Sequence, residues 1–148
     1  MTARPRLLLD VMLGRLASYL RMCGYDTVYA LDRGVEADDT LRTIAAQEGR
    51  MLVTRDVSLA AQVPESILLR EREVTDQLRE LQTAGLALEL EAPTYCGRCN
   101  GALAESSPET PPEYVPDGVS TLWQCVDCGQ YFWKGSHWER VGKTLQSL

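Results

Sequence analysis

The chain has 148 residues, 45% of them apolar, and this length fits one compact domain or a domain of about 90 residues followed by a small module. Fifteen basic residues against 21 acidic ones give a net charge of −6, which argues against non-specific binding to nucleic acid through a basic surface. No run of about 20 apolar residues exists, and residues 1–6 and the short apolar run that ends in Asp10 are untypical of a signal peptide. We therefore expect a cytoplasmic protein with no membrane partner.

Residues 6–92 alternate short apolar runs with stretches of helical periodicity, which predicts an α/β fold. Strands are expected at residues 6–10, 27–31, 51–54, 66–69 and 86–90. Helices are expected from residue 12 to Gly24, from Asp38 or Asp39 as a cap to Gly49, over 58–62, and from Thr75 as a cap to Gly85. This alternation implies βαβ units and a mostly parallel sheet with helices on both faces, and it leaves the order of the strands open.

The composition changes at Pro93, so we expect an α/β domain at 1–92 and a small module at 93–148. The module holds two C-x-x-C pairs separated by 25 residues, namely Cys96, Cys99, Cys125 and Cys128. Four thiolates so spaced suit a tetrahedral Zn²⁺ ion and leave no open position for substrate. We predict a structural zinc ribbon whose folding energy comes largely from the metal. The rival interpretation, two disulfides, does not suit a cytoplasmic chain.

An aromatic segment follows the second cysteine pair directly and reads Tyr-Phe-Trp-Lys-Gly-Ser-His-Trp over residues 131–138. Aromatic rings beside the Lys134 cation can stack on unpaired bases, or they can pack against the ribbon and the first domain. His137 is the one histidine of the chain. It is a candidate for contacting substrate or moving a proton, and equally a candidate for a structural role.

Carboxylates follow the predicted strands where a ligand usually binds. Asp10 closes the first strand, Asp56 follows the third, and Asp38 and Asp39 open a helix. The carboxyl ends of parallel strands meet at one edge of a sheet, so these groups are expected to converge there. Converging carboxylates repel unless a divalent cation joins them, and Mg²⁺ or Mn²⁺ suits such ligands. Two such ions promote phosphodiester hydrolysis. The alternative is that these aspartates cap helices and turns.

Three arginines lie near the predicted acidic edge. Arg15 and Arg21 belong to the first predicted helix, and Arg55 precedes Asp56. Each is a candidate for binding phosphate, although an exposed helix face explains Arg15 and Arg21 equally well. Cys23 has no paired cysteine nearby in the sequence and is expected to be a buried thiol.

Several blocks of the sequence carry a family resemblance. They read Leu-Asp-Val-Met-Leu-Gly-Arg-Leu at 9–16, Leu-Arg-Met-Cys-Gly-Tyr-Asp-Thr at 20–27 and Leu-Val-Thr-Arg-Asp at 52–56. Together they resemble the PIN-like RNase family named after the C-terminal domain of the mutator exonuclease. The two cysteine pairs with Trp-Lys-Gly-Ser-His at 133–137 are similar to the zinc ribbon that ends that family's domain. The resemblance covers nearly the whole chain and is weakest in the Pro-rich stretch at 105–118.

The resemblance implies a PIN-like three-layer α/β fold and divalent-metal-dependent cleavage of RNA. By position it makes Asp10 the acid of the first strand and Asp56 the acid of the Thr-Arg-Asp block. The middle acid falls on Asp38 or Asp39, and we favour Asp39 as the ligand with Asp38 as the cap. A further acid after the fourth strand would be Glu71, or is absent, which is a departure from the family pattern.

The sequence thus predicts an endoribonuclease in which Asp10, Asp39 and Asp56, with Asp38 as the alternative, hold Mg²⁺ or Mn²⁺. The predicted substrate contacts are Arg15, Arg21, Arg55, Lys134 and His137. A second hypothesis is an RNA- or ribosome-associated binding module with a vestigial site. A phosphatase of the DxD type is disfavoured because Met12 stands where the second aspartate is needed. The oligomeric state cannot be read from the sequence.

Overall fold

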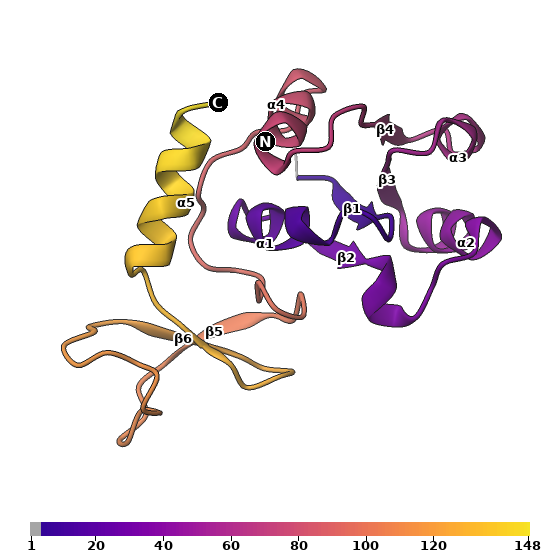
Figure 1. The fold of residues 1–148 in the computed structure, drawn as a ribbon. Helices are drawn as coiled ribbons and strands as arrows, with labels where there is room; N and C mark the ends of the chain where they lie inside the picture. The colour runs from indigo at the N-terminus through magenta and orange to yellow at the C-terminus, as the bar shows by residue number, and fades with distance from the viewer. Residues whose placement is uncertain (1–3) are drawn as a thin grey trace.

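A parallel sheet of four strands lies at the centre of the computed structural model, which describes residues 4–148 (Figure 1). The strands are β1 (Arg6–Leu9), β2 (Thr27–Tyr29), β3 (Arg50–Thr54) and β4 (Ser66–Leu68), and they lie in the order β2-β1-β3-β4. The chain leaves β1 to one side to form β2 and then returns to the other side to form β3. The two central strands, β1 and β3, are therefore neighbours at the point where the strand order reverses.

Helices cover both faces of this sheet, as predicted. They are α1 (Gly14–Met22) and α4 (Val74–Thr83) on one face and α2 (Asp38–Glu48) and α3 (Val57–Gln62) on the other, with a short 3₁₀ helix, η1 (Ala30–Arg33), after β2. Successive residues of a strand point to opposite faces. Leu7 and Leu9 of β1 accordingly join one apolar cluster, Leu8 joins the other, and all three are 0% exposed. The three-layer α/β architecture is confirmed.

The predicted strand at 86–90 is wrong. Leu86 and Leu88 are buried and alternate with exposed residues, so the apolar pattern is real. The carbonyl of Ala87, however, accepts hydrogen bonds from the Tyr25 hydroxyl at 2.9 Å and from Arg4 at 3.1 Å. Side chains bond to this segment in place of a neighbouring strand, and it remains an extended linker.

Two predicted helix caps are also wrong. Helix α2 begins after Ala37 and α4 after Glu73, and in neither case does a side chain cap the first turn. Asp38 and Asp39 lie inside the first turn of α2, where a carboxylate stabilises the positive end of the helix dipole instead. Gly24, Gly49 and Gly85 do follow helices as predicted, each with a positive φ.

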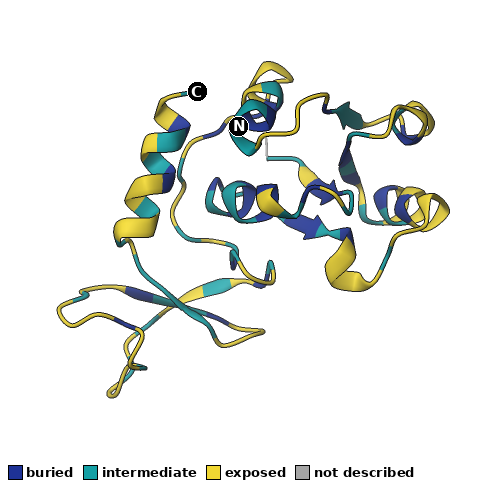
Figure 2. Cartoon of the chain, viewed as in Figure 1, coloured by how far each residue is buried: buried dark blue, intermediate teal, exposed yellow. Residues whose placement is uncertain are grey.

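The second unit is a small antiparallel sheet, with strands in the order β5-β6-β7. They are β5 (Leu103–Ser106), β6 (Leu122–Cys125) and β7 (Tyr131–Phe132). The chain then returns to the first unit as α5 (Ser136–Gln146), which presents a buried stripe and an exposed one (Figure 2). Val141 and Leu145 of this stripe belong to the same apolar cluster as β1 and α1. The end of the predicted second module thus packs on the first. The boundary at Pro93 stays a prediction.

Among residues 4–148, no helix has both the length and the apolar character that crossing a membrane requires.

Candidate functional site

Four cysteine sulfurs gather in the second unit. The Sγ atoms of Cys96 and Cys128 lie 3.7 Å apart, and those of Cys99 and Cys125 lie 3.5 Å apart. All are free thiols, and their separations far exceed the roughly 2.05 Å of a disulfide bond. Four sulfurs placed tetrahedrally at 2.3 Å from a Zn²⁺ ion would lie about 3.8 Å from one another. The cluster could therefore hold a metal ion such as zinc.

Backbone groups prepare this cluster for a cation. The N–H groups of Asp127 and Cys128 both donate to Cys125 Sγ at 3.4 Å. Although burial raises the pKa of the Cys125 thiol, these donors lower it to about 7, whereas burial raises the pKa of Cys96 to about 12. A Cβ at Gly101 would lie 2.6 Å from Cys125 Sγ, so only glycine allows the chain to pass this close. The local backbone is shaped around the sulfurs.

Side-chain hydrogen bonds fix the loop that carries Cys96 and Cys99 to the first unit. Asn100, the one non-glycine residue with positive φ in residues 4–148, donates to Asp26 Oδ1 at 2.7 Å and accepts from the Thr27 N–H at 2.9 Å. Arg21 is 3% exposed and donates to the carbonyls of Thr27 and Gly97, both at 3.0 Å. Burial lowers the pKa of Arg21, and neighbouring acids partly oppose this shift. These donors hold the two units together, and the role of Arg21 as an RNA contact stays a prediction.

The acidic edge lies at the carboxyl ends of β1 and β3. Asp10 Oδ2 accepts a hydrogen bond from the Thr54 hydroxyl at 2.7 Å, and Asp10 Oδ1 accepts from the Val11 N–H at 2.8 Å. The Thr54 oxygen in turn accepts from the Asp56 N–H at 3.0 Å. Asp56 Oδ1 caps α3 by accepting from the Leu59 N–H at 3.1 Å. Thr54 is 0% exposed, so this link between the two acids is held by the core.

The middle acid is less well placed. Asp39 is paired with Arg42 one turn further along α2, and its side chain is 86% exposed. In the described residues 4–148, the cysteines form the one group of three or more His, Cys, Asp or Glu side chains whose ligand atoms lie within 4.8 Å of one another. Asp10, Asp56 and either Asp38 or Asp39 are not drawn together to that distance, and their joint metal site stays a prediction.

Glu71, the candidate for a further acid, is exposed after β4. Its N–H and that of Arg70 donate to the two carboxylate oxygens of Glu80, at 2.9 and 2.8 Å. These bonds fix the backbone of the loop and leave the role of the Glu71 side chain untested.

The predicted cationic contacts have different surroundings. Arg15 is exposed on α1. Arg55 is half-buried, and its Nε has no hydrogen-bond partner among the described residues. Lys134 Nζ lies 5.8 and 5.4 Å from the ring centroids of Trp123 and Trp138. His137 is exposed on the first turn of α5 and lines a cavity between the two units.

Sequence reasoning missed two groups of structural importance. Thr54 stands in the quoted Thr-Arg-Asp block, and a hydroxyl at the end of an otherwise apolar strand beside an acid was the available signal. Asn100 follows the first cysteine pair, and asparagine tolerates the left-handed conformation that such a turn needs. The partners of Asn100, Asp26 and Thr27, lie over 70 residues away in the chain, so no local pattern reveals them.

Comparison with known protein families gives one match. The model of the Mut7-C RNAse domain matches residues 5–145 of the chain. No curated protein matches, and no solved structure does. The matched range runs from the start of β1 almost to the end of α5, so the family pattern spans the acidic edge, the four cysteines and the helix that returns to the core.

Proposed function

The chain belongs to the Mut7-C RNAse domain family, and from this premise we propose that it is a divalent-metal-dependent endoribonuclease. One observation carries the proposal. Asp10 and Asp56 lie beyond the carboxyl ends of adjacent strands where the strand order reverses, and the buried Thr54 hydroxyl joins them. Ligands of open α/β sheets bind at this kind of switch point.

Two metals are proposed, at separate places. Zn²⁺ bound to the four cysteines would be structural, because four protein ligands leave no open position. At the acidic edge Asp10 and Asp56 would hold Mg²⁺ or Mn²⁺, with Asp39 or Asp38 as the third acid. A divalent ion held there supplies charge neutralisation and an activated water for hydrolysis of the phosphodiester bond. Thr54 would fix the orientation of the Asp10 carboxylate.

Groups that suit an RNA strand surround the acids. Arg15 and Arg55 would bind phosphate oxygens, and Arg55 Nε is a buried donor with no partner in the described chain. Met12 is 70% exposed, Val57 is 69% exposed and Leu31 is 46% exposed, and each follows one of the three strands β1, β3 and β2. These three exposed apolar side chains follow strands at the same sheet edge as the acids, and they are candidates for contacting the RNA.

The alternative function is an RNA-binding module without catalysis. The other partners of the carboxylates favour this alternative. Asp56 already caps helix α3, and Asp39 is paired with Arg42. This alternative predicts that RNA binding is independent of Asp10 and Asp56, and that no divalent ion promotes cleavage.

Cleavage of end-labelled single-stranded RNA by the zinc-loaded protein, with and without added Mn²⁺ or Mg²⁺, decides between the two functions. We expect Asp10→Asn and Asp56→Asn each to lower the rate by more than about 100-fold, since each removes a proposed metal ligand. Thr54→Val should lower it by roughly 10- to 100-fold, which is the usual effect of losing a group that orients a ligand.

Asp117→Asn, a change in the exposed loop between β5 and β6, is the matched control and should leave the rate unchanged. Cleavage that persists in Asp10→Asn would refute the assignment of the site. RNA binding without metal-dependent cleavage in the parent protein would favour the binding module.

A further inference from the structure

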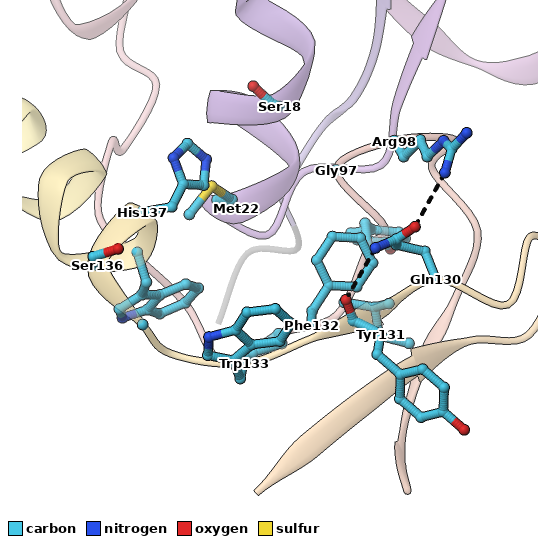
Figure 3. Close-up of a pocket in the computed structure, with 15 residues that line it drawn as sticks. Ser18, Met22, Gly97, Arg98, Gln130, Tyr131, Phe132, Trp133, Ser136 and His137 are labelled. Carbon is cyan, nitrogen blue, oxygen red and sulfur yellow. Dashed lines mark hydrogen bonds between the residues drawn. The ribbon is translucent and has the colours of Figure 1, made fainter. Parts of the chain in front are cut away.

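A cavity of about 540 Å³ opens where α1, the zinc ribbon and α5 meet. In Figure 3, Ser18 and Met22 of α1 lie on one side, and Phe132 and Trp133 of the ribbon lie on the other. Arg98, from the loop between the first two cysteines, and His137 of α5 complete the rim. The size is within the usual range for pockets that enclose a small organic group.

The lining of this cavity is unusually aromatic. The chain has three Trp, six Tyr and one Phe, and five of these residues line this one cavity. They are Tyr95, Tyr131, Phe132, Trp133 and Trp138. Planar aromatic faces in such number favour a planar ligand, because stacking on them requires no particular hydrogen-bonding pattern.

Trp133 is held in place before any ligand arrives. Tyr114 stacks on it with ring centroids 6.2 Å apart and an interplanar angle of 28°. A Cβ at Gly135 would lie 2.6 Å from Trp133 Nε1, so the glycine allows the chain to turn closely past the indole. A ring fixed in this way loses little conformational entropy when a ligand stacks on it.

The charge of the cavity is opposite to that of the whole chain. None of its lining residues is Asp or Glu, although the chain carries 21 of them. Arg98 lies on the rim, and Lys134 lies over the ring of Trp138. Glu139, in the first turn of α5, is not among the lining residues. The local charge therefore suits an anionic ligand.

Hydrogen-bonding groups are available at the same place. Arg98 Nη1 donates to the Gln130 side-chain oxygen at 3.0 Å, and both residues border the cavity (Figure 3). Helix α5 begins at the cavity, and Gly135, its N-cap residue, provides no side chain to cap the first N–H groups. Free N–H groups at a helix N-terminus favour a phosphate.

We propose that this cavity binds an unpaired nucleobase of single-stranded RNA, with the base stacked on the aromatic wall and a neighbouring phosphate near Arg98 and the start of α5. The proposal rests on RNA being the ligand of the proposed function, and it assigns a second binding site in addition to the acidic edge. It makes the zinc ribbon part of the substrate-binding surface, because the ribbon supplies most of the aromatic wall.

Helix α1 connects the cavity to the acidic edge. Its preceding turn is bonded to Asp10, since the Leu13 N–H donates to the Asp10 carbonyl at 3.0 Å. Ser18 lies about 6 Å further along the helix than Gly14, at the cavity. Arg15 is exposed one turn before Ser18, between the two sites. A strand held by one base in the cavity can therefore follow α1 to the acids.

Fluorescence anisotropy with a short labelled oligoribonucleotide tests this site apart from cleavage. Zinc-loaded protein carrying Asp10→Asn keeps the RNA intact and is the parent for all variants. Trp133→Leu should weaken binding roughly 10-fold, the usual cost of losing one stacked base. Arg98→Gln should weaken it by a few-fold, since a phosphate contact is lost. Arg79→Gln, an exposed change on α4, is the matched control and should have no effect.

Oligonucleotides with a single abasic position identify the base itself. We expect one abasic position to weaken binding to the parent roughly 10-fold and to cost nothing further in Trp133→Leu. The proposal is overturned if every abasic position costs the same in both proteins, or if Trp133→Leu and Arg98→Gln bind RNA as the parent does. The latter result is also the one expected of a cavity that takes a peptide.

The zinc content of each variant shows whether its ribbon is folded, and Arg98→Gln changes an exposed side chain. Failure of the two proposals is distinguishable. Metal-dependent cleavage with no role for Trp133 or Arg98 rejects the cavity alone. If an abasic position weakens RNA binding to the parent but not to Trp133→Leu, and the unmodified chain does not cleave RNA, then only the ribonuclease proposal is rejected.

Discussion

The α/β unit and the zinc ribbon are stabilised by different means. Each face of the parallel sheet has its own cluster of fully buried leucines. In the described segment 93–135 the buried apolar side chains, apart from two cysteines, are only Val115 and Leu122. A segment with so little core needs another source of folding energy, and the proposed binding of a metal to the four cysteines would supply it.

The ribbon, which has the smaller core, is kept in position by contacts with the α/β unit. The ribbon is preceded by Leu88 and Leu90, which pack on the core of the α/β unit, and followed by α5, which packs on the same core. Asn100 and Arg21 add side-chain bonds between the two units. The ribbon is therefore tethered at both ends, and loss of its metal should loosen it without unfolding the α/β unit.

Removal of the metal should produce the largest difference in stability between the ribbon and the α/β unit. Cys125→Ser, or a chelator, is expected to abolish hydrogen-exchange protection in β5 and β6, because metal binding supplies roughly 10–16 kcal/mol to small zinc modules. Amides of β1 and β3 should remain protected. Cys23→Ala is the matched control: Cys23 is a buried thiol of the α/β core, with a pKa that burial raises to about 12, and the change should leave zinc content intact. Parallel loss of protection in β1 would show that the two units unfold as one.

The bond between the units can be tested at Asn100. Asn100→Gly keeps the positive φ and removes the bonds to Asp26 and Thr27, which should lower the free energy of unfolding of the zinc-loaded protein by about 1–2 kcal/mol. Asn100→Ala should cost about 1 kcal/mol more, because alanine is strained at this φ. Equal values for the two variants in denaturant titrations would contradict the role of backbone conformation here.

A smaller effect is expected within the α/β unit. Hydrogen bonds from Arg33 and Arg50 lower the pKa of Glu48 from 4.5 to about 2. The folded state therefore holds fewer protons, so this stabilisation is complete above pH 4.5 and is lost as the pH falls towards 2. Glu48→Gln should cost about 1 kcal/mol at neutral pH, since the carboxylate is partly exposed, and nothing near pH 2.

This last prediction is tested by the difference in the free energy of unfolding between Glu48→Gln and the wild type. The difference is measured by denaturation with zinc and again with chelator. The two series should agree if Glu48 acts within the α/β unit alone. Glu89→Gln, an exposed change in the linker, should show no such dependence on pH. A cost for Glu48→Gln that appears only with zinc would place its effect at the ribbon instead.

The sequence predicts the α/β unit well because its information is local. Apolar runs and helical periodicity identify β1 to β4 and α1 to α4, and the spacing of the cysteine pairs identifies the cluster. The segment at 86–90 was misread because alternation reports burial, whereas a strand also needs a backbone partner, and here Tyr25 and Arg4 provide the bonds. The order β2-β1-β3-β4 depends on contacts that no single element encodes.

The candidate sites are predicted less completely for the same reason. Asp10 and Asp56 were identified from their positions after strands, yet their link through Thr54 follows from the pairing of β1 with β3. The surroundings of Arg21 depend on where the ribbon docks, so its position on α1 alone does not reveal its bond to the Gly97 carbonyl. The aromatic segment was visible in the sequence, but the cavity that it forms with α1 and α5 appears only in three dimensions.

The account assigns cleavage to the acidic edge and binding of a base to the aromatic cavity. Its most direct test is single-turnover cleavage of labelled RNA, with rate and affinity measured together. The account predicts that Asp10→Asn loses the rate at saturating protein while its affinity is unchanged, and that Trp133→Leu loses affinity while its rate at saturation is unchanged. A Trp133→Leu protein that keeps its zinc and its affinity but loses the rate would contradict the account, as would an Asp10→Asn protein that still cleaves.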